Sequence, residues 1–200
     1  MLYRIAHILQ DRLPFLWDIV EWVNSTLFVL RYGKRLKCIP TILNKYGGVY
    51  QFRQATSSDI EDLVAFFQEQ PSLSYEYFKP HDFNAKTIKK LVKRKSHLFF
   101  IVLDHHKVVG YYFLRSFFMG KSYLGKIVDE NYRGKGIGKL MCLSAMEVAV
   151  SVGLHMYETI SKDNLASLYS SQKVLDVKII EEMDNNYIYV EDFPKGTLIG

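Results

Sequence analysis

The sequence has few cysteines: only Cys38 and Cys142 occur among its 200 residues. They stand far apart in the chain, and neither has other metal-binding side chains at the spacing of a ligand set. The composition therefore indicates neither a disulfide-stabilised secreted domain nor a cysteine-based metal site. We expect a cytoplasmic protein that binds no metal.

Long apolar runs are missing as well. The longest uncharged stretches are about ten residues, whereas a helix that crosses a bilayer needs about 20. The apolar N-terminus is interrupted by Asp11, Arg12, Asp18 and Glu21, and no small-residue cleavage site follows it. We therefore expect neither a transmembrane helix nor a signal peptide.

Acidic residues are missing from two basic segments. Residues 31–45 carry five cations and residues 86–95 carry six. Such segments can attract phosphate groups, nucleic acid or anionic lipid, but they more often form solvated helix faces. Because the net charge is only +5, we expect no nucleic-acid partner.

Core-forming side chains, in contrast, are abundant. Hydrophobic residues make up 48% of the chain and aromatic residues 14%, which indicates a well-packed globular body. The length suits one domain with an appended element. Because Gly47 and Gly48 mark a boundary, we expect a helical extension over residues 1–48 and the main domain over residues 49–200.

Hydrophobic periodicity predicts alternating helices and strands. Helical spacing predicts two short amphipathic helices between residues 2 and 30, interrupted near Pro14. Period-two alternation and turn residues predict several strands further along the chain. The expected order is strand 49–55, helix 56–70, helix 84–95, strands 97–104, 108–118 and 122–129, helix 137–152, strand 154–160, helix 163–175 and a hairpin over 177–192. We therefore expect an α/β (α+β) fold, in which helices flank a mixed, mostly antiparallel central sheet.

The segment DENYRGKGIGKLM, residues 129–141, places three glycines and three cations just before an apolar helix. Amides at the first turn of a helix have no internal acceptor, and the helix dipole favours an anion there. Glycines also let the backbone come close to a ligand. The segment therefore predicts a phosphate cradle, with a loop whose glycines serve only for turning as the alternative. It lacks the Gly-Lys-Ser/Thr ending of a nucleotide P-loop.

Residues 133–138 resemble the Arg/Gln-x-x-Gly-x-Gly/Ala motif of the GNAT N-acetyltransferase superfamily, and the predicted element order over residues 49–192 is similar to that of the family. The resemblance implies the GNAT fold and an acyltransferase that uses acetyl-CoA. It also implies that Ile127 and Val128 contact the pantetheine arm and the acetyl group. The implied pyrophosphate contacts are Arg133, Gly134, Lys135, Gly136, Ile137 and Gly138.

A second element of the family is an Asn after the next strand, followed three residues later by a small residue and seven later by Tyr. Asn164 and Ser167 fit this pattern and are implied donor contacts. Ser171 stands at the Tyr position, and Tyr169 comes two residues early, about 200° around the helix. In the family this Tyr commonly protonates the departing CoA thiolate. Both residues are candidates for that acid, but we expect neither to be indispensable.

Transfer of an acetyl group to an amine needs a base or a water chain and a contact that stabilises the oxyanion. The resemblance implies the amide of Val128 for the oxyanion. Candidates for the base are Asp129, Glu130, Glu158 and His81. Each of them also has a simpler interpretation, as a loop cap, a solvated strand residue or an ordered loop residue.

The aromatic segment over residues 74–83 is the candidate acceptor site. Tyr75, Tyr77, Phe78 and His81 offer flat apolar faces with polar tips, although the segment could simply pack over the core. We expect a small-molecule amine as acceptor, with amino sugars among the candidates. The alternatives are transfer onto a protein lysine or N-terminus, and a module that binds CoA without catalysis, an option that the missing Tyr favours.

The N-terminal helices need a partner for their apolar stripe, because an exposed stripe would be a large apolar patch. The stripe can dock on the catalytic body, pair with a second subunit in a homodimer, or lie on an anionic membrane. We favour docking, since acids at 11, 18 and 21 interrupt a basic polar face. The stripe consists of Phe15, Leu16, Trp17, Ile19, Trp22 and Val23.

Overall fold

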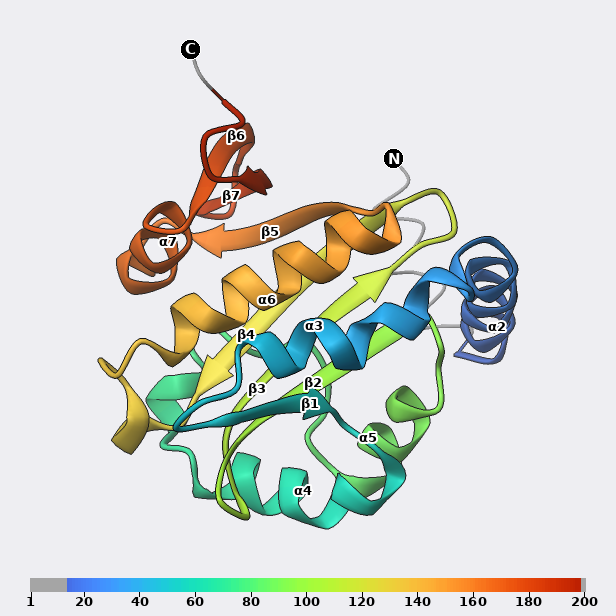
Figure 1. Ribbon diagram of the computed structural model, residues 1–200, viewed down its shortest axis with the longest axis horizontal. Helices are drawn as coiled ribbons and strands as arrows, with labels where there is room; N and C mark the ends of the chain where they lie inside the picture. Colours follow the sequence, from blue (N-terminus) through green and yellow to red (C-terminus); the bar gives the residue numbers. More distant parts are fainter. Residues whose placement is uncertain (1–13, 199–200) are drawn as a thin grey trace.

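The computed structural model describes residues 14–198 and has a seven-stranded sheet at its centre (Figure 1). The strands lie in the order β1-β2-β3-β4-β5-β7-β6. Neighbouring strands are antiparallel except for β4 and β5, which run parallel. The mixed, mostly antiparallel sheet of the sequence prediction is therefore confirmed. The strands are β1 Gln51–Gln54, β2 His97–Asp104, β3 Lys107–Ser116, β4 Lys121–Val128, β5 His155–Ser161, β6 Leu175–Met183 and β7 Tyr187–Pro194.

Strands β4 and β5 pair over a short distance only. Their register includes Lys121 with His155, Ser122 with Met156 and Tyr123 with Tyr157, and no later pair. Beyond Tyr123, β4 stays paired with β3 up to Val128, while β5 pairs with β7. The two parallel strands therefore diverge in the second half of β4 and open a gap in the middle of the sheet.

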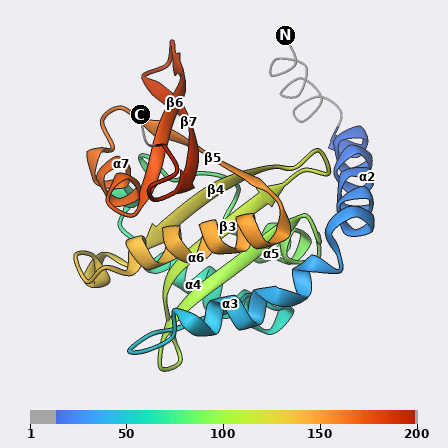
Figure 2. The same cartoon turned by 45° about the horizontal axis from the view of Figure 1, so that its top comes forward.

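Helices cover both faces of the sheet. Helix α6 (Ile137–Val152) and helix α3 (Ile39–Lys45) pack on one face, whereas α4 (Ile60–Glu69) and α5 (Ala85–Val92) pack on the other (Figure 2). The short helix α7 (Leu165–Gln172) packs beside β5, β6 and β7. A 3₁₀ turn, η1 (Arg35–Cys38), precedes α3, and others lie at Ser57–Asp59 (η2), Ser72–Tyr75 (η3) and Glu130–Tyr132 (η4).

Several helix ends follow from local sequence. Thr56 and Asp59 form a capping box ahead of α4, and Asp59 also accepts two hydrogen bonds from Arg53. The side chain of Asn84 accepts from the amide of Thr87 and caps α5, as the sequence predicts. Helix α6 ends at Gly153, whose φ of +87° is the left-handed conformation that glycine adopts easily.

The N-terminal helix α2 runs without a break from Pro14 to Tyr32. Proline fits at this position because the first helical residue needs no amide partner. The helix predicted ahead of Pro14 lies outside the described residues. Within residues 14–198, no helix combines the length and the apolar character that a bilayer span requires.

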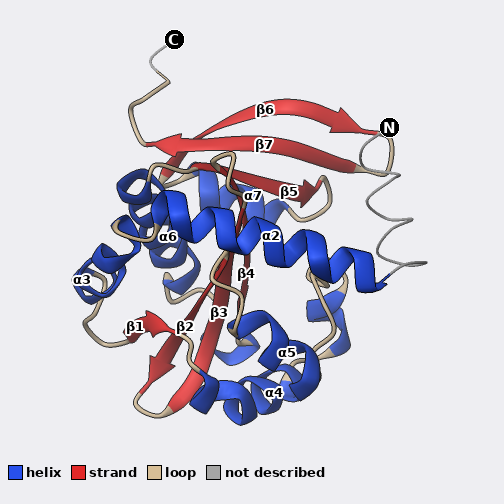
Figure 3. Ribbon diagram, turned by 90° about the vertical axis from the view of Figure 1, so that its right-hand side faces the viewer, coloured by secondary structure: helices blue, strands red, loops and turns tan. Residues whose placement is uncertain are grey.

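The way in which α2 docks corrects the sequence prediction. The expected docking stripe is largely exposed: Phe15 is 73% exposed and Trp22 66%. The polar side of the helix faces the body instead, through Asp18, Glu21 and Asn24. Helix α2 therefore lies across the turn end of the β3–β4 hairpin (Figure 3). Its apolar side chains face outward.

The segment after α2 is integral to the core. Ile39, Ile42 and Leu43 of α3 are buried together with Phe28 and Tyr32 in the cluster under α6. In the sequence, residues 31–45 stand out only as a basic stretch, because cations and Pro40 mask the helical spacing of three apolar residues. The domain boundary near residue 48 stays a prediction, and the segments on its two sides share one core.

Candidate active site

The glycine loop joins the end of β4 to the start of α6. Gly134 and Gly136 have φ angles of +76° and +83°, and Gly136 is the N-cap of α6. A Cβ atom at either position would meet nothing within 4 Å. The backbone conformation, rather than crowding within the chain, therefore requires glycine at both positions. Gly138 is different, because its φ is outside the positive range and a Cβ there would only touch Ser170.

The loop contains backbone amides that have no hydrogen-bond partner within the described part of the chain. The first hydrogen bonds of α6 run from the amides of Lys139 and Leu140 back to the carbonyl of Gly136. The amides of Ile137 and Gly138 precede these donors at the positive end of the helix dipole, where an anion is favoured. The geometry of the loop therefore matches the phosphate cradle that the sequence predicts.

The cations of the loop occupy its edge. Arg133 donates from Nη2 to Ser74 Oγ over 2.7 Å, which ties the loop to η3. The ammonium of Lys135 lies 4.3 Å from the ring centroid of Tyr132. Lys139 is exposed on the first turn of α6. These three cations stand within four residues of Ile137 in the sequence, and they add positive charge to the loop.

The end of β4 points an amide into the gap between β4 and β5. The amide of Asp129 donates to the carbonyl of Val109 on β3 over 2.9 Å. Successive amides along a strand point to opposite edges, so the amide of Val128 points away from β3. That direction is the side from which β5 has diverged.

A buried polar cluster lies beside this gap, on the α6 face of the sheet. The ammonium of Lys126 is 2.6 Å from a carboxylate oxygen of Glu158 and 3.1 Å from the hydroxyl of Ser171. Ser171 in turn donates to Glu158 over 2.8 Å. The Lys126 and Glu158 side chains are only 8% and 5% exposed. Lys126 therefore lies beside Ser171, the residue that stands where the family pattern has a Tyr.

Burial and neighbouring charges shift the pKa values of two groups in and beside the cluster, Lys126 and Asp192. Burial by itself lowers the pKa of Lys126, but the neighbouring acidic groups Cys142, Glu158 and Asp192 outweigh it, so the pKa lies above the usual value. Burial, together with the carboxylate of Glu158, raises the pKa of Asp192 to about 8. Neither carboxyl oxygen of Asp192 has a hydrogen-bond partner. Asp192 therefore keeps its proton to a higher pH than an exposed carboxyl group does.

The other candidate acids and bases have varied surroundings. Asp129 is buried, accepts from the amide of Asn131 and lies 3.4 Å from the ammonium of Lys107, so it caps the loop. Glu130 is exposed. Tyr169 is 57% exposed on α7, away from the cluster that contains Ser171. Asn164 caps α7 by accepting from the amide of Ser167 over 3.1 Å.

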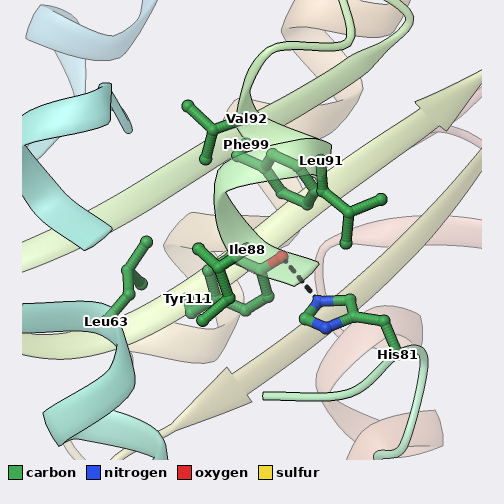
Figure 4. A pocket seen from close by; sticks show the side chains of 7 residues that line it. All are labelled: Leu63, His81, Ile88, Leu91, Val92, Phe99 and Tyr111. Atoms are coloured by element: carbon green, nitrogen blue, oxygen red, sulfur yellow. Dashed lines mark hydrogen bonds between the residues drawn. The ribbon is translucent and has the colours of Figure 1, made fainter. Parts of the chain in front are cut away.

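The aromatic segment folds mainly onto the core. Tyr75 donates to the carbonyl of Phe67, and Phe78 packs against the cluster under α4 and α5. His81 points at the hydroxyl of Tyr111, 3.1 Å away, and burial lowers its pKa (Figure 4). The pocket around His81 has no room for a water molecule. Of the four aromatic candidates, only Tyr77 is exposed; the other three are half-buried.

A row of three tyrosines, which the sequence does not predict, crosses three strands of the sheet. Tyr123, Tyr157 and Tyr189 come from β4, β5 and β7, with ring centroids 6.0 Å apart for the first two and 5.4 Å for the last two. The strand registers place them on the same face as Phe113. All three are half-buried, and Tyr157 donates to Glu191 over 2.9 Å. We call this row the tyrosine shelf. It borders the gap between β4 and β5 on the face opposite the buried cluster.

The cluster and the shelf escaped the sequence analysis for one reason. Each is assembled from strands that are distant in sequence, and only the register brings their side chains together. Alternation within β4 places Lys126 on one face and Tyr123 on the other, but it names no partner on β5 or β7. In the described part of the chain, no group of three or more metal-binding side chains comes together.

Comparison with known proteins gives one family. The model of the acetyltransferase (GNAT) family matches residues 60–172. A search of the curated proteins finds no match for the sequence.

Solved structures share the fold. The GNAT domain of S. lividans PAT superimposes with a TM-score of 0.64 at 15% identity, covering 74% of this chain and 92% of that one. Ribosomal-protein-S5-alanine acetyltransferase from Vibrio fischeri gives 0.64 at 16% identity, with coverage of 76% and 96%. PaiA N-acetyltransferase from Thermoplasma acidophilum, in complex with coenzyme A, gives 0.60 at 16% identity, with coverage of 72% and 98%. At this level of identity the likeness concerns the fold alone.

Proposed function

The chain belongs to the acetyltransferase (GNAT) family, whose members use acetyl-CoA, and from that premise we propose that it transfers the acetyl group to the amine of a small molecule by direct transfer. The single observation that carries the proposal is the glycine loop. Its unpaired amides and its two glycines of positive φ follow, after the short turn η4, the strand end at which the sheet opens. An anionic donor with a long thin arm fits this combination.

The donor site is proposed to extend from the loop into the gap. The amides of residues 134–138 would hold the pyrophosphate, with Arg133 and Lys135 beside it. Ile127 and Val128 would border the pantetheine arm and the acetyl group. Asn164 and Ser167 would contact the donor from the start of α7, where Asn164 also caps the helix.

In the proposed reaction, the lone pair of a neutral amine attacks the thioester carbon, the C–S bond breaks, and the amine loses one proton. The Val128 amide is directed into the gap and would donate to the oxyanion of the tetrahedral intermediate. A water chain rather than a buried side chain would take the proton. Asp129 is committed to the loop, and Glu158 is ion-paired with Lys126.

We assign to Lys126 the stabilisation of the departing thiolate. Its ammonium lies beside the position of the missing Tyr and is held by Glu158 and Ser171. A thiol ionises near pH 8.5, and the pKa of Lys126 is raised above its usual value. The proton therefore stays on the ammonium. The ammonium would stabilise the thiolate by donating a charge-assisted hydrogen bond to it, without transferring a proton.

The acceptor is proposed to bind over the tyrosine shelf. Three phenol rings offer flat apolar surfaces with hydroxyl tips, which suit a sugar ring, and Glu191 beside Tyr157 suits a cationic amine. Tyr77 is the exposed aromatic candidate of that segment, and it would close over this site. An amino sugar is therefore the acceptor class that we favour.

Two measurements test the proposed function. Calorimetry with acetyl-CoA reports donor binding, and release of free thiol in the presence of amine libraries reports transfer. We expect binding together with thiol release for amino sugars. Release with peptides alone would indicate a protein acceptor, and binding without any release would indicate a non-catalytic CoA-binding module.

A further inference from the structure

Helix α2 contacts the body through all of its acidic residues. Asp18 pairs with Lys90 and Arg94 of the α5 region. Glu21 is buried and lies 2.6 Å from Arg115 of β3. The same side of the helix continues with Asn24, which bonds to the β3–β4 turn, and ends with buried aromatic rings at residues 28 and 32. This side fixes α2 to the catalytic body.

The opposite side of α2 is apolar and faces solvent. Between residues 15 and 30 the only charged side chains are Asp18 and Glu21, and both are paired with cations of the body, so the outward side carries no unpaired charge. Trp22 and Leu30 are 66% and 78% exposed. We call this surface the α2 ridge. It consists of Phe15, Leu16, Ile19, Val20, Trp22, Val23, Leu27 and Leu30.

Cations flank the α2 ridge at both ends. Near its start, exposed lysines of α5 lie on the helix that pairs with Asp18. Near its end, an open hollow of about 610 Å³ is lined by Val29 and Leu30 together with four cations. No acidic residue occurs from residue 22 to residue 58. The four cations of this basic hollow are Arg31, Lys34, Arg35 and Lys37.

This pattern fits an anionic lipid surface better than a second copy of the chain. In a two-fold dimer the same patch faces itself, so the cations at both ends of the α2 ridge would meet cations of the partner. Anionic headgroups complement both ends, while the ridge enters the boundary between headgroups and acyl chains. Asp18 and Glu21 keep the helix attached to the body, so it would lie along the surface.

We propose that α2 is a membrane-surface anchor, whose ridge inserts shallowly into an anionic phospholipid bilayer while the basic hollow binds headgroup phosphates. The inference does not depend on the proposed acetyl transfer. It differs from the expectation drawn from the sequence, which favoured docking of the apolar stripe over contact with a membrane. Glu21 is buried against Arg115, and Asp18, although 42% exposed, is paired with Lys90 and Arg94. Neither acid therefore leaves an unpaired negative charge on the surface that would meet lipid.

The test uses the full chain and vesicles of phosphatidylcholine, with and without phosphatidylglycerol. We expect sedimentation with the anionic vesicles only, and loss of binding at high salt. Trp22→Ser should reduce partitioning at least 10-fold. Lys37→Glu should reduce it about 10- to 30-fold, whereas the matched control Lys178→Glu, on exposed strand β6, should leave it unchanged. Because these residues are exposed, we expect the variants to fold like the wild type, and circular dichroism tests their fold.

A spectroscopic readout places the helix. The chain has two tryptophans, so a Trp17→Phe variant leaves Trp22 as the only one. Its emission should shift to the blue on anionic vesicles and be quenched by lipids brominated near the headgroup. No shift and no sedimentation would overturn the proposal. So would a full-length dimer that Trp22→Ser makes monomeric without any vesicle binding, or binding that appears only after residues 1–13 are deleted.

Discussion

Gly136 shows how one residue can determine donor binding. Its φ of +83° disfavours any residue with a Cβ, although the surrounding space is open. We expect Gly136→Val to tilt the first amides of α6 and to weaken acetyl-CoA binding about 10-fold, or roughly 1.4 kcal/mol. Gly196→Val is the matched control, because Gly196 has a φ of +85° in open space but lies near the C-terminus. Equal affinities for the wild type and folded Gly136→Val, measured by calorimetry, would refute the assignment of the loop.

Lys126 carries a second prediction at this scale. Replacing it by Met should lower kcat about 10²-fold, the usual effect of removing one donor from a developing charge, with little change in acetyl-CoA affinity. The pKa of enzyme-bound CoA thiol, followed through its reaction with a disulfide reagent, should rise. Lys126→Met alone would leave the Glu158 carboxylate buried without its partner. The double variant Lys126→Met/Glu158→Gln removes that charge, so its kcat reports the loss of the ammonium and not misfolding. A wild-type kcat in the folded double variant would contradict the assigned role.

Asp192 makes stability depend on pH. Burial and the nearby Glu158 raise its pKa to about 8, whereas an Asp in an unfolded chain has a pKa of about 3.9. Between these pH values the folded chain holds a proton that the unfolded chain has lost, so the free energy of unfolding falls as pH rises, by up to about 1.4 kcal/mol per pH unit. Urea unfolding from pH 5 to pH 8 should show this decline, and Asp192→Asn should reduce it. The exposed control Asp184→Asn should not; identical profiles for Asp192→Asn and wild type would show that Asp192 is ionised in the folded state.

At the scale of elements, α2 shows how ion pairs orient a helix. Glu21 is 4% exposed in its pair with Arg115, whereas Asp18 is 42% exposed. Removing one partner of a buried pair leaves an uncompensated charge, so Glu21→Ala should cost about 2 to 3 kcal/mol of unfolding free energy. Asp18→Ala in the same helix should cost no more than about 1 kcal/mol. Equal losses in chemical denaturation would mean that α2 is held by its aromatic end rather than by Glu21.

Elements defined by local patterns were predictable, and their orientation was not. The capped helices at Asn84 and Asn164, the strands β2 to β4 and the hairpin at Asn186 follow from spacing and turn residues within a few positions. The apolar stripe of α2 was equally visible. Its direction was not, because it depends on partners at positions 90, 94 and 115 that only the folded sheet brings close.

At the scale of the molecule, the fold places two different surfaces on the two sides of one opening. The gap between β4 and β5 has the buried cluster of Lys126 on its α6 side and the tyrosine shelf on the other. The loop and its glycines could be read from the sequence because they are contiguous. The cluster and the shelf could not, because the registers of β4, β5 and β7 create them.

Thiol release from acetyl-CoA, measured with amino sugars for wild type and for Gly136→Val, tests the proposed transfer most directly. We predict that wild type releases thiol in proportion to acetylated amine, and that Gly136→Val needs about 10-fold more acetyl-CoA to reach the same rate. Wild-type protein that binds acetyl-CoA but releases no thiol with any amine would contradict the proposed transfer. The same acetyl-CoA dependence in both proteins would contradict the assigned donor site.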